Sequence, residues 1–314
     1  MRVVTAKDID WVLDYPILIA AIHAAFRDNI VAPPRHHHRI VRPSTEATLL
    51  LMPAWQQGAD GGFIGVKLVS VFPDNATRSL PSVMGTYLLM AGDSGAPLAA
   101  IDGVALTLWR TAATSALVSS ALARPDATHM AMIGAGALAP HLISAHATVR
   151  PLTHVSIWNR TPEHAVHLAA ELTRAGLTVT PTTDREAAIR AADIVSVATL
   201  SNEPLVEGAW LKPGTHVDLV GAFTPAMREA DDAAIRWSTV YVDSRAGMKE
   251  SGDITQPLAS GALTEAAIAG ELADIVAPGF AGRRSADEIT LFKSVGHAAE
   301  DLAAAVEVWR RLGA

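Results

Sequence analysis

Three basic residues stand where a positive charge needs a partner: Arg35 in APPRHHH, Lys67 in FIGVKLVSVF and Arg110 in LWRTAATSA. Lys67 lies between Val66 and Leu68, and burying an ammonium group in such an apolar stretch costs hydration unless it meets an anion. We therefore predict that Lys67 contacts an anionic ligand. The alternative is a lysine on an edge strand whose side chain points to water. Arg110 by itself could equally form a local cap or ion pair.

A glycine-rich segment is the second chemical signal. HMAMIG runs into GAGALA at residues 134–139, which is the pattern G-x-G-x-x-A between an expected strand and an expected helix. Gly134 permits a tight turn, Gly136 lets the backbone approach a pyrophosphate, and Ala139 keeps the helix close to the sheet. The phosphates would face the free N–H groups at the helix start, so we predict a dinucleotide site. The alternative is that the glycines serve the geometry of a βα turn alone.

The next expected strand ends in Asn159, Arg160 and Thr161, where NAD-specific proteins usually have an acid. A carboxylate would repel a 2′-phosphate, whereas an arginine flanked by hydrogen-bond donors would bind it. We therefore predict NADPH as the cofactor, with NADH as a weaker alternative. The structural alternative is that Arg160 is a solvated residue at the end of a strand.

The hydrophobic pattern predicts the elements that must position these residues. Residues 5–29 have a helical apolar face, residues 48–102 form short β-type runs separated by turn residues, and residues 106–124 have the Ala- and Ser-rich composition of a closely packed helix. We interpret Asp102-Gly103 as a hairpin turn. After residue 126, strands alternate with helices, which predicts a parallel sheet. From Asp287 onward, apolar residues recur at spacings of three and four, which predicts one long amphipathic helix.

These patterns predict an α/β protein, in which a Rossmann-type, doubly wound parallel sheet is joined to an α+β N-terminal domain. The length of 314 residues is sufficient for two domains. We place the N-terminal domain at residues 1–118, completed by 293–314, and the Rossmann domain at residues 119–292.

Composition excludes several classes of function. The chain has 25 Lys+Arg against 32 Asp+Glu, and its net charge of −7 disfavours binding to a long nucleic acid. Cysteine is absent, which excludes disulfides, thiolate nucleophiles and zinc–cysteine sites. The consecutive histidines 36–38 lack partner ligands at suitable spacing, so we predict no metal site. A signal peptide would need an unbroken apolar stretch where this chain has Asp8, Asp10 and Asp14. No later uncharged apolar run approaches 18 residues. We therefore expect a soluble cytoplasmic protein without a membrane partner.

Seven short segments together resemble the ornithine cyclodeaminase/mu-crystallin family of nicotinamide-dependent enzymes. The resemblance covers almost the whole chain: PPR at 33–35, MPAW at 52–55, VKLV at 66–69, PLAAIDG at 97–103, RTAATSA at 110–116, GAGALA at 134–139 and TLFKSVG at 290–296. RTAATSA and the glycine loop after it are specific to the family. The resemblance implies that the N-terminal domain serves for substrate binding and dimerisation, in a homodimer in which the N-terminal sheets of two subunits pair.

The same resemblance implies that Arg35, Lys67 and Arg110 hold the α-carboxylate of a small cyclic imino acid beside the nicotinamide. It implies substrate contacts at Arg35, Lys67, Arg110, Phe223 and Val295. It implies cofactor contacts at Ser82, Arg110, Thr111, Gly134, Gly136, Ala137, Leu138, Asn159, Arg160, Thr161, Thr199, Val220, Gly221 and Ser294.

One position departs from the cyclodeaminases of the family. They carry an aspartate that handles the substrate amine where this chain has Phe223, in Gly221-Ala222-Phe223. A phenyl ring can neither exchange a proton nor attract a cationic amine, so loss of ammonia from ornithine is disfavoured. The segment VGAFTPAMREAD resembles the branch that reduces cyclic ketimines, Δ1-pyrroline-2-carboxylate to L-proline and also Δ1-piperideine-2-carboxylate to L-pipecolate.

The implied mechanism is hydride transfer from C4 of NADPH to C2 of the C=N bond while the cationic residues hold the carboxylate. Lys67 is the predicted catalytic residue and the first candidate for the proton donor, bound water is the second, and His297 is the third. We interpret His297 as a surface histidine because it lies off the apolar stripe of the last helix. The alternatives are an ornithine cyclodeaminase, an L-alanine dehydrogenase, and a non-catalytic, mu-crystallin-like protein that binds NADPH.

Overall fold

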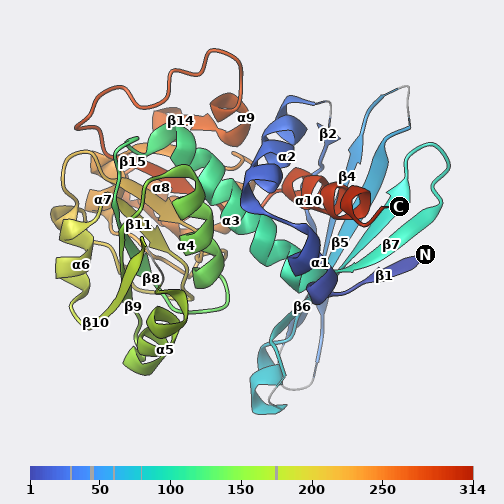
Figure 1. Ribbon diagram of the computed structural model, residues 1–314, viewed down its shortest axis with the longest axis horizontal. Helices are drawn as coiled ribbons and strands as arrows, with labels where there is room; N and C mark the ends of the chain where they lie inside the picture. Colours follow the sequence, from blue (N-terminus) through green and yellow to red (C-terminus); the bar gives the residue numbers. More distant parts are fainter. Residues whose placement is uncertain (29, 43–45, 59–60, 79, 174–175, 314) are drawn as a thin grey trace. The chain divides into compact units, whose positions relative to one another are not determined.

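The structure, a computed structural model, describes residues 1–28, 30–42, 46–58, 61–78, 80–173 and 176–313 (Figure 1). It divides into two compact units, one formed by Met1–Arg110 with His297–Ala314 and the other by Thr111–Gly296. The sequence placed these boundaries at residues 118 and 292. The first one falls inside helix α3 (Gly103–Leu122), where an unbroken helix has no turn residues to mark the change of unit.

The first unit is built on a sheet in the order β1-β7-β6-β5-β4-β2, with β3 paired to β4. β4 to β7 form an antiparallel meander, which confirms the expectation for residues 48–102, while β1 pairs with β7 in parallel. The strands are β1 (Arg2–Val4), β2 (Ile30–Val31), β3 (His36–Ile40), β4 (Ala47–Gln56), β5 (Phe63–Val71), β6 (Val83–Ala91) and β7 (Pro97–Asp102). A 3-10 turn, η1 (Pro73–Arg78), precedes β6.

The N-terminal segment is not the single helix expected for residues 5–29. Arg2–Val4 form strand β1, and two helices follow, α1 (Ala6–Val12) and α2 (Tyr15–Arg27). The break has a local cause, because Asp14 accepts a hydrogen bond from the Ile17 N–H and Pro16 stands in the first turn of α2. The apolar periodicity continues across the break, so the pattern alone did not reveal it.

The C-terminal segment also differs from the expected long helix. Thr290–Lys293 form strand β15, and the helix α10 (Ala298–Arg311) begins only after His297. Gly296, at φ 91°, lies in the left-handed region between the two elements. Helix α10 packs against α2 and on strands β4, β5 and β6, and so brings the end of the chain onto the first unit's sheet (Figure 1).

The second unit is a parallel sheet in the order β10-β9-β8-β11-β12-β15-β13-β14. All residues of β11, β12 and β15 are buried, so both faces of the central sheet are covered, as a doubly wound sheet requires. This confirms the predicted Rossmann-type fold. The strands are β8 (His129–Ile133), β9 (His154–Trp158), β10 (Thr178–Thr182), β11 (Ile194–Val197), β12 (His216–Leu219), β13 (Thr239–Val242), β14 (Ile268–Glu271) and β15 (Thr290–Lys293).

The helices of this unit follow its strands in turn. They are α4 (Ala139–Val149), α5 (Pro162–Leu172), α6 (Arg185–Ala191), α7 (Asp232–Trp237), α8 (Gly252–Ser260) and α9 (Leu272–Ile275), with short 3-10 turns η2 (Gly208–Trp210), η3 (Gly247–Glu250) and η4 (Glu265–Ala267). Because the strand order changes direction between β8 and β11, the carboxyl ends of these two strands border the crevice in which such sheets bind ligands.

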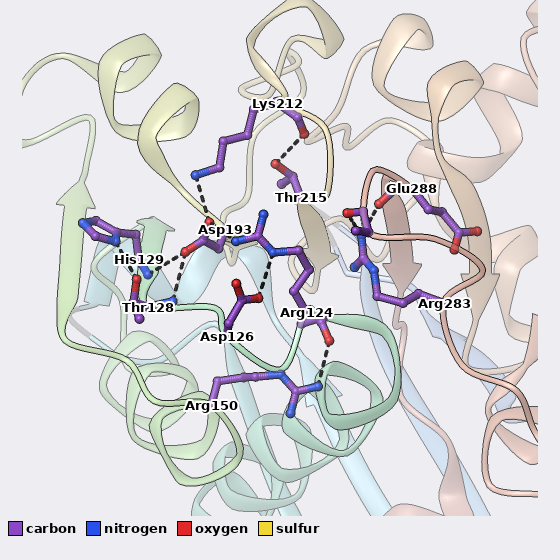
Figure 2. Close-up of polar contacts among 12 residues, drawn as sticks. Arg124, Asp126, Thr128, His129, Arg150, Asp193, Lys212, Thr215, Arg283 and Glu288 are labelled. Atoms are coloured by element: carbon purple, nitrogen blue, oxygen red, sulfur yellow. Dashed lines mark hydrogen bonds and ion pairs between the residues drawn. The ribbon is translucent and has the colours of Figure 1, made fainter.

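Asp193 ties together the amino ends of the central strands (Figure 2). Its carboxylate accepts hydrogen bonds from the Thr128 N–H at 2.9 Å and the His129 N–H at 3.1 Å, just where β8 begins. Lys212 Nζ lies 2.9 Å and Arg124 Nη2 3.3 Å from the same carboxylate. These contacts stabilise the amino ends of the strands, opposite the carboxyl ends where the predicted cofactor residues lie.

Among the described residues, no single helix has both the length and the apolar character needed to cross a membrane. The pair α1 and α2, bent by 94°, satisfies these two criteria only when its helices are taken together.

Candidate substrate and cofactor sites

Lys67 is buried in the first unit, and its charge is balanced by an acid of the chain itself. It lies in β5, between β4 and β6, so the alternative of a solvated lysine on an edge strand is wrong. Its Nζ lies 2.8 Å from Asp301 Oδ1 and 2.7 Å from Asp301 Oδ2, at the start of α10. Asp301 is therefore the anion that balances the buried ammonium group of Lys67.

Arg110 joins the same cluster from α3. Its Nη1 lies 2.6 Å from Glu300 Oε2, and its Nε lies 3.0 Å from Asp301 Oδ1. Glu300 and Asp301 are both fully buried. Sequence reasoning missed these two acids, because an acidic pair in the first turn of a helix is explained by the helix dipole alone. The signal that could have found them is their place on the apolar, Ala-rich side of the helix in HAAEDLAAAV.

A third cation lies near this cluster. Arg35 is half-buried and close enough to act on the charges of Lys67 and Asp301. Burial lowers the pKa of Lys67 to about 8, with Asp301 opposing the shift and Arg110 adding to it. Lys67 therefore releases its proton far more readily than an exposed lysine does.

A tyrosine that the sequence did not single out lies beside the cluster. Tyr87 in β6 is opposite Lys67 in β5, and its side chain is fully buried. A Cβ atom at Gly65 would overlap the Tyr87 hydroxyl, so this glycine makes room for the phenol ring. Burial raises the pKa of Tyr87, and the Asp301 charge adds to the effect. The Tyr87 phenol therefore stays uncharged beside the Lys67 cluster.

The glycine loop of the second unit has the geometry that a pyrophosphate needs. Gly134 follows β8 with φ 110°, and a Cβ there would lie 2.5 Å from the Ala198 carbonyl oxygen. Nothing lies within 4 Å of a Cβ built at Gly136, so the backbone is open to a ligand at that point. Helix α4 begins at Ala139, and its N-cap residue Leu138 makes no side-chain cap hydrogen bond. The loop and helix start therefore fit the phosphates of a dinucleotide.

The residues expected to contact a 2′-phosphate differ in their surroundings. Asn159 Oδ1 accepts a hydrogen bond from the Ala135 N–H at 3.0 Å, and Asn159 Nδ2 donates to the Thr161 carbonyl at 2.9 Å. Asn159 thus ties the end of β9 to the glycine loop. Arg160 and Thr161 are exposed.

The remaining predicted residues of the second unit gather at the carboxyl ends of its strands. Thr199 follows β11, Val220 and Gly221 follow β12, and Ser294 and Val295 follow β15. Because these strands are parallel neighbours, the three loops lie along one edge of the sheet. The loop after β15 is held by a residue that the sequence analysis did not find, Asp243, which accepts hydrogen bonds from the Val295 and Gly296 N–H groups, each at 2.6 Å.

Phe223 lies in the loop after β12, two residues beyond Gly221, and its side chain is 39% exposed. Thr111 is buried within α3, and Ser82 is half-buried before β6 in the first unit. The second unit also contains a buried group of charges, Glu229, Asp253 and Lys293, that sequence analysis overlooked.

Three local expectations concern residues outside these clusters. Asp102 does not form a hairpin turn, because its side chain accepts hydrogen bonds from the Val104 and Ala105 N–H groups and so caps α3. His297 is half-buried, and its Nδ1 accepts from the Ala299 N–H at the start of α10. The histidines 36–38 lie exposed on β3, and no group of three or more possible metal ligands occurs among the described residues.

Comparisons with known proteins cover both units. A model of the ornithine cyclodeaminase/mu-crystallin family matches residues 2–314. Delta(1)-pyrroline-2-carboxylate reductase of Paracoccus denitrificans is 41% identical over 281 residues, which cover 89% of this chain and 84% of that protein. The protein of the same name from Colwellia psychrerythraea is 35% identical, with 99% of each chain covered. The solved structure of Thermococcus litoralis Delta(1)-pyrroline-2-carboxylate reductase in complex with NADH and L-proline is similar with a TM-score of 0.92 and 33% identity, over 99% of this chain and 97% of that one.

Proposed function

Because this chain belongs to the ornithine cyclodeaminase/mu-crystallin family, we propose that it is an NAD(P)H-dependent reductase of cyclic ketimines. Its substrates are Δ1-pyrroline-2-carboxylate, reduced to L-proline, and Δ1-piperideine-2-carboxylate, reduced to L-pipecolate. The relatives that carry the name of a pyrroline-2-carboxylate reductase support this assignment.

The single observation that carries the proposal is the group of cations around Lys67. Lys67 and Arg110 are held by the buried acids Glu300 and Asp301, and Arg35 lies close enough to act on the same charges. Cationic groups held in this way favour a substrate with a carboxylate over a neutral substrate. The acids hold the cations in place, which fixes the orientation of the bound carboxylate.

Phe223 favours a ketimine reductase over a cyclodeaminase. A cyclodeaminase needs a carboxylate to handle the substrate amine, and a phenyl ring supplies neither charge nor proton. An apolar, partly exposed ring suits the hydrocarbon part of a cyclic imino acid.

In the proposed reaction, a bound reduced nicotinamide cofactor would supply the hydride that C2 of the imine needs. Lys67 donates the proton that the ring nitrogen needs, and its lowered pKa of about 8 suits a proton donor near neutral pH. Hydride and proton together convert the C=N bond to a secondary amine, and Lys67 then regains its proton from solvent. Arg35 and Arg110 keep the carboxylate bound throughout.

The proposal includes a preference for NADPH over NADH. Arg160 is exposed at the end of β9, where an acid would exclude a 2′-phosphate. We expect Arg160→Asp to reverse the preference, as measured by the ratio of kcat/KM values for the two cofactors. A wild-type protein that clearly prefers NADH would contradict this part of the proposal and leave the reductase assignment intact.

The proposal further includes a homodimer formed through the sheet of the first unit. One face of this sheet carries α10, and the other presents an apolar row that crosses four strands in register: Pro53, Val66, Leu88 and Ala100. An apolar row of this kind favours association with a second copy of the chain.

The test is a turnover panel with both nicotinamide cofactors. We expect NADPH oxidation with Δ1-pyrroline-2-carboxylate and Δ1-piperideine-2-carboxylate, and no NAD(P) reduction with ornithine or alanine. Lys67→Ala should abolish turnover and leave cofactor binding within about twofold of wild type, because Lys67 belongs to the first unit and the glycine loop to the second.

Other results of the panel point to other functions. Activity with ornithine indicates a cyclodeaminase, and activity with alanine indicates an alanine dehydrogenase. Tight NADPH binding without turnover of any substrate indicates a ligand-binding protein. Each of these results overturns the reductase assignment.

A further inference from the structure

A buried carboxylate joins the loops at the carboxyl ends of β11 and β12. Glu229 is fully buried, and its Oε1 accepts hydrogen bonds from the Thr199 N–H at 2.7 Å and the Thr199 hydroxyl at 2.9 Å. Its Oε2 accepts from the Gly221 N–H at 2.8 Å and the Ala222 N–H at 3.3 Å. One carboxylate thus holds two loops, with one oxygen for each.

These two loops approach each other and the glycine loop closely. A Cβ atom at Gly221 would overlap both the Thr199 backbone and the Glu229 carboxylate, so only glycine fits at that position. A Cβ at Gly134 would lie 3.1 Å from the Thr199 side chain. The placement of Thr199 therefore affects both the phosphate end of the crevice, through Gly134, and the loop after β12.

Two further charges pack on Glu229. Lys293, from β15, lies with its Nζ 3.9 Å from Glu229 Oε2 and 3.2 Å from Asp253 Oδ2. Asp253, from α8, accepts a hydrogen bond from the Glu229 N–H at 2.7 Å. The loops after β11 and β12 contribute only N–H and hydroxyl donors to the Glu229 carboxylate. One lysine thus faces two buried acids, so the group carries a negative charge when all three are ionised.

We propose that ionised Glu229 is a positioning residue for the nicotinamide cofactor, which sets the spacing of the Thr199 and Gly221 loops against which the cofactor binds. Glu229 acts through these loops and does not itself contact the reacting atoms. The inference rests on the proposed function, because it requires a cofactor in the crevice of the second unit. It adds a residue that the motifs of the chain did not identify.

Protonation of Glu229 should loosen this arrangement. Burial raises its pKa to about 7, with Lys293 opposing the shift and Asp253 adding to it. A protonated carboxyl group has lost its charge and one of its acceptor positions, so it no longer binds both loops equally. Cofactor binding should therefore be strongest above about pH 7 and weaken as the pH falls below that value.

The experiment measures NADH dissociation constants between pH 5.5 and 8.5 by quenching of protein fluorescence. NADH is the probe because it lacks the 2′-phosphate of NADPH, whose own titration near pH 6 would obscure the result. We expect Glu229→Gln to raise the dissociation constant at pH 8 by about tenfold to a hundredfold, the effect of losing one charge-assisted hydrogen bond. Its binding should also be independent of pH, unlike that of wild type.

Asp193→Asn is the matched control. Asp193 also accepts hydrogen bonds from two backbone N–H groups and pairs with basic residues, but at the amino ends of the same strands (Figure 2). A merely structural role for Glu229 predicts that both variants lower the melting temperature and neither changes NADH binding. We expect the control to keep the wild-type dissociation constant and its pH dependence.

Glu229→Asp covers the case in which Glu229→Gln does not fold. The shorter carboxylate still titrates but cannot reach both loops, so binding should be weaker than in wild type and still dependent on pH. If Glu229→Gln binds NADH as tightly as wild type, or keeps the wild-type pH profile, the inference is wrong and the reductase assignment stands. If wild type binds neither NADH nor NADPH, the proposed function and the inference fail together.

Discussion

The burial of Lys67 governs both the charge and the acidity of the first unit's cluster. The ammonium group is enclosed between β5 and α10, where Asp301 stabilises its charged form and Arg110 disfavours it. Its pKa of about 8 lies well below the usual value of a lysine because burial outweighs the attraction of the acid. A small change of pH near 8 therefore changes the charge of the cluster.

We predict opposite effects of alkaline pH on activity and on stability. Above about pH 8, Lys67 loses the proton it should donate, so kcat/KM for the cyclic imine should fall about tenfold per pH unit. Between about pH 8 and 10.5 the unfolded chain binds a proton at Lys67 that the folded chain does not, so the Lys67 contribution to the free energy of unfolding should rise with pH. Steady-state kinetics and urea unfolding across this range measure the two slopes.

Lys67→Arg is the control for this prediction. A guanidinium group stays charged throughout the range, so the alkaline loss of kcat/KM should move to higher pH even if the variant is less active. An unchanged alkaline limb in Lys67→Arg would assign the titration to another group.

Secondary structure elements carry their own determinants of stability, and α3 is a clear case. This helix holds Arg110 and Thr111, and it begins directly after β7 without a turn of several residues. Asp102, the last residue of β7, caps it by accepting hydrogen bonds from Val104 N at 3.0 Å and Ala105 N at 2.9 Å. The cap joins a strand of the sheet to the helix that supplies a cation of the cluster.

We predict that Asp102→Ala lowers the free energy of unfolding by about 1 kcal/mol, the usual cost of losing a helix cap. Denaturation by urea at pH 7 measures the change. Asp102→Asn should stay within about 0.5 kcal/mol of wild type, because asparagine caps helices nearly as well. Equal stability of Asp102→Ala and wild type would show that the cap contributes nothing.

At the scale of the whole molecule, the proposed homodimer depends on the face of the first unit's sheet opposite α10. In register, Met52, Lys67, Tyr87 and Ile101 form the buried row beneath the helices, and Pro53, Val66, Leu88 and Ala100 form the adjacent row on the other face. The period of two along each strand separates the ionic cluster from the apolar surface.

We predict that Leu88→Asp converts the proposed homodimer to a monomer, because each subunit would bring one aspartate into the interface and two like charges would have to be desolvated there. Light scattering coupled to size-exclusion chromatography measures the mass. Lys7→Asp, a comparable change of charge at an exposed position of α1, should leave the mass unchanged. A wild-type monomer at micromolar concentration would contradict the proposed dimer.

Several features of the fold and the candidate sites were predictable because they are local. The alternation of strands and helices after residue 126, the glycine loop and the meander of β4 to β7 each have a signal within a short window. The errors also have local causes: the apolar period hid the break at Asp14, and the spacing of Phe292 and Val295 resembled that of a helix although a strand and a loop occupy those positions.

The sequence by itself determined which residues carry charge in apolar surroundings and where a dinucleotide loop lies. Only the tertiary structure decided which partners those charges have. Asp301 is 234 residues from Lys67, and Glu300 is 190 residues from Arg110, so no spacing rule connects them. Glu229 likewise meets Thr199 and Gly221 only because β11 and β12 are neighbours in the sheet. A charged residue in an apolar stretch indicates that a partner is needed, but strand order and helix packing determine which residue is that partner.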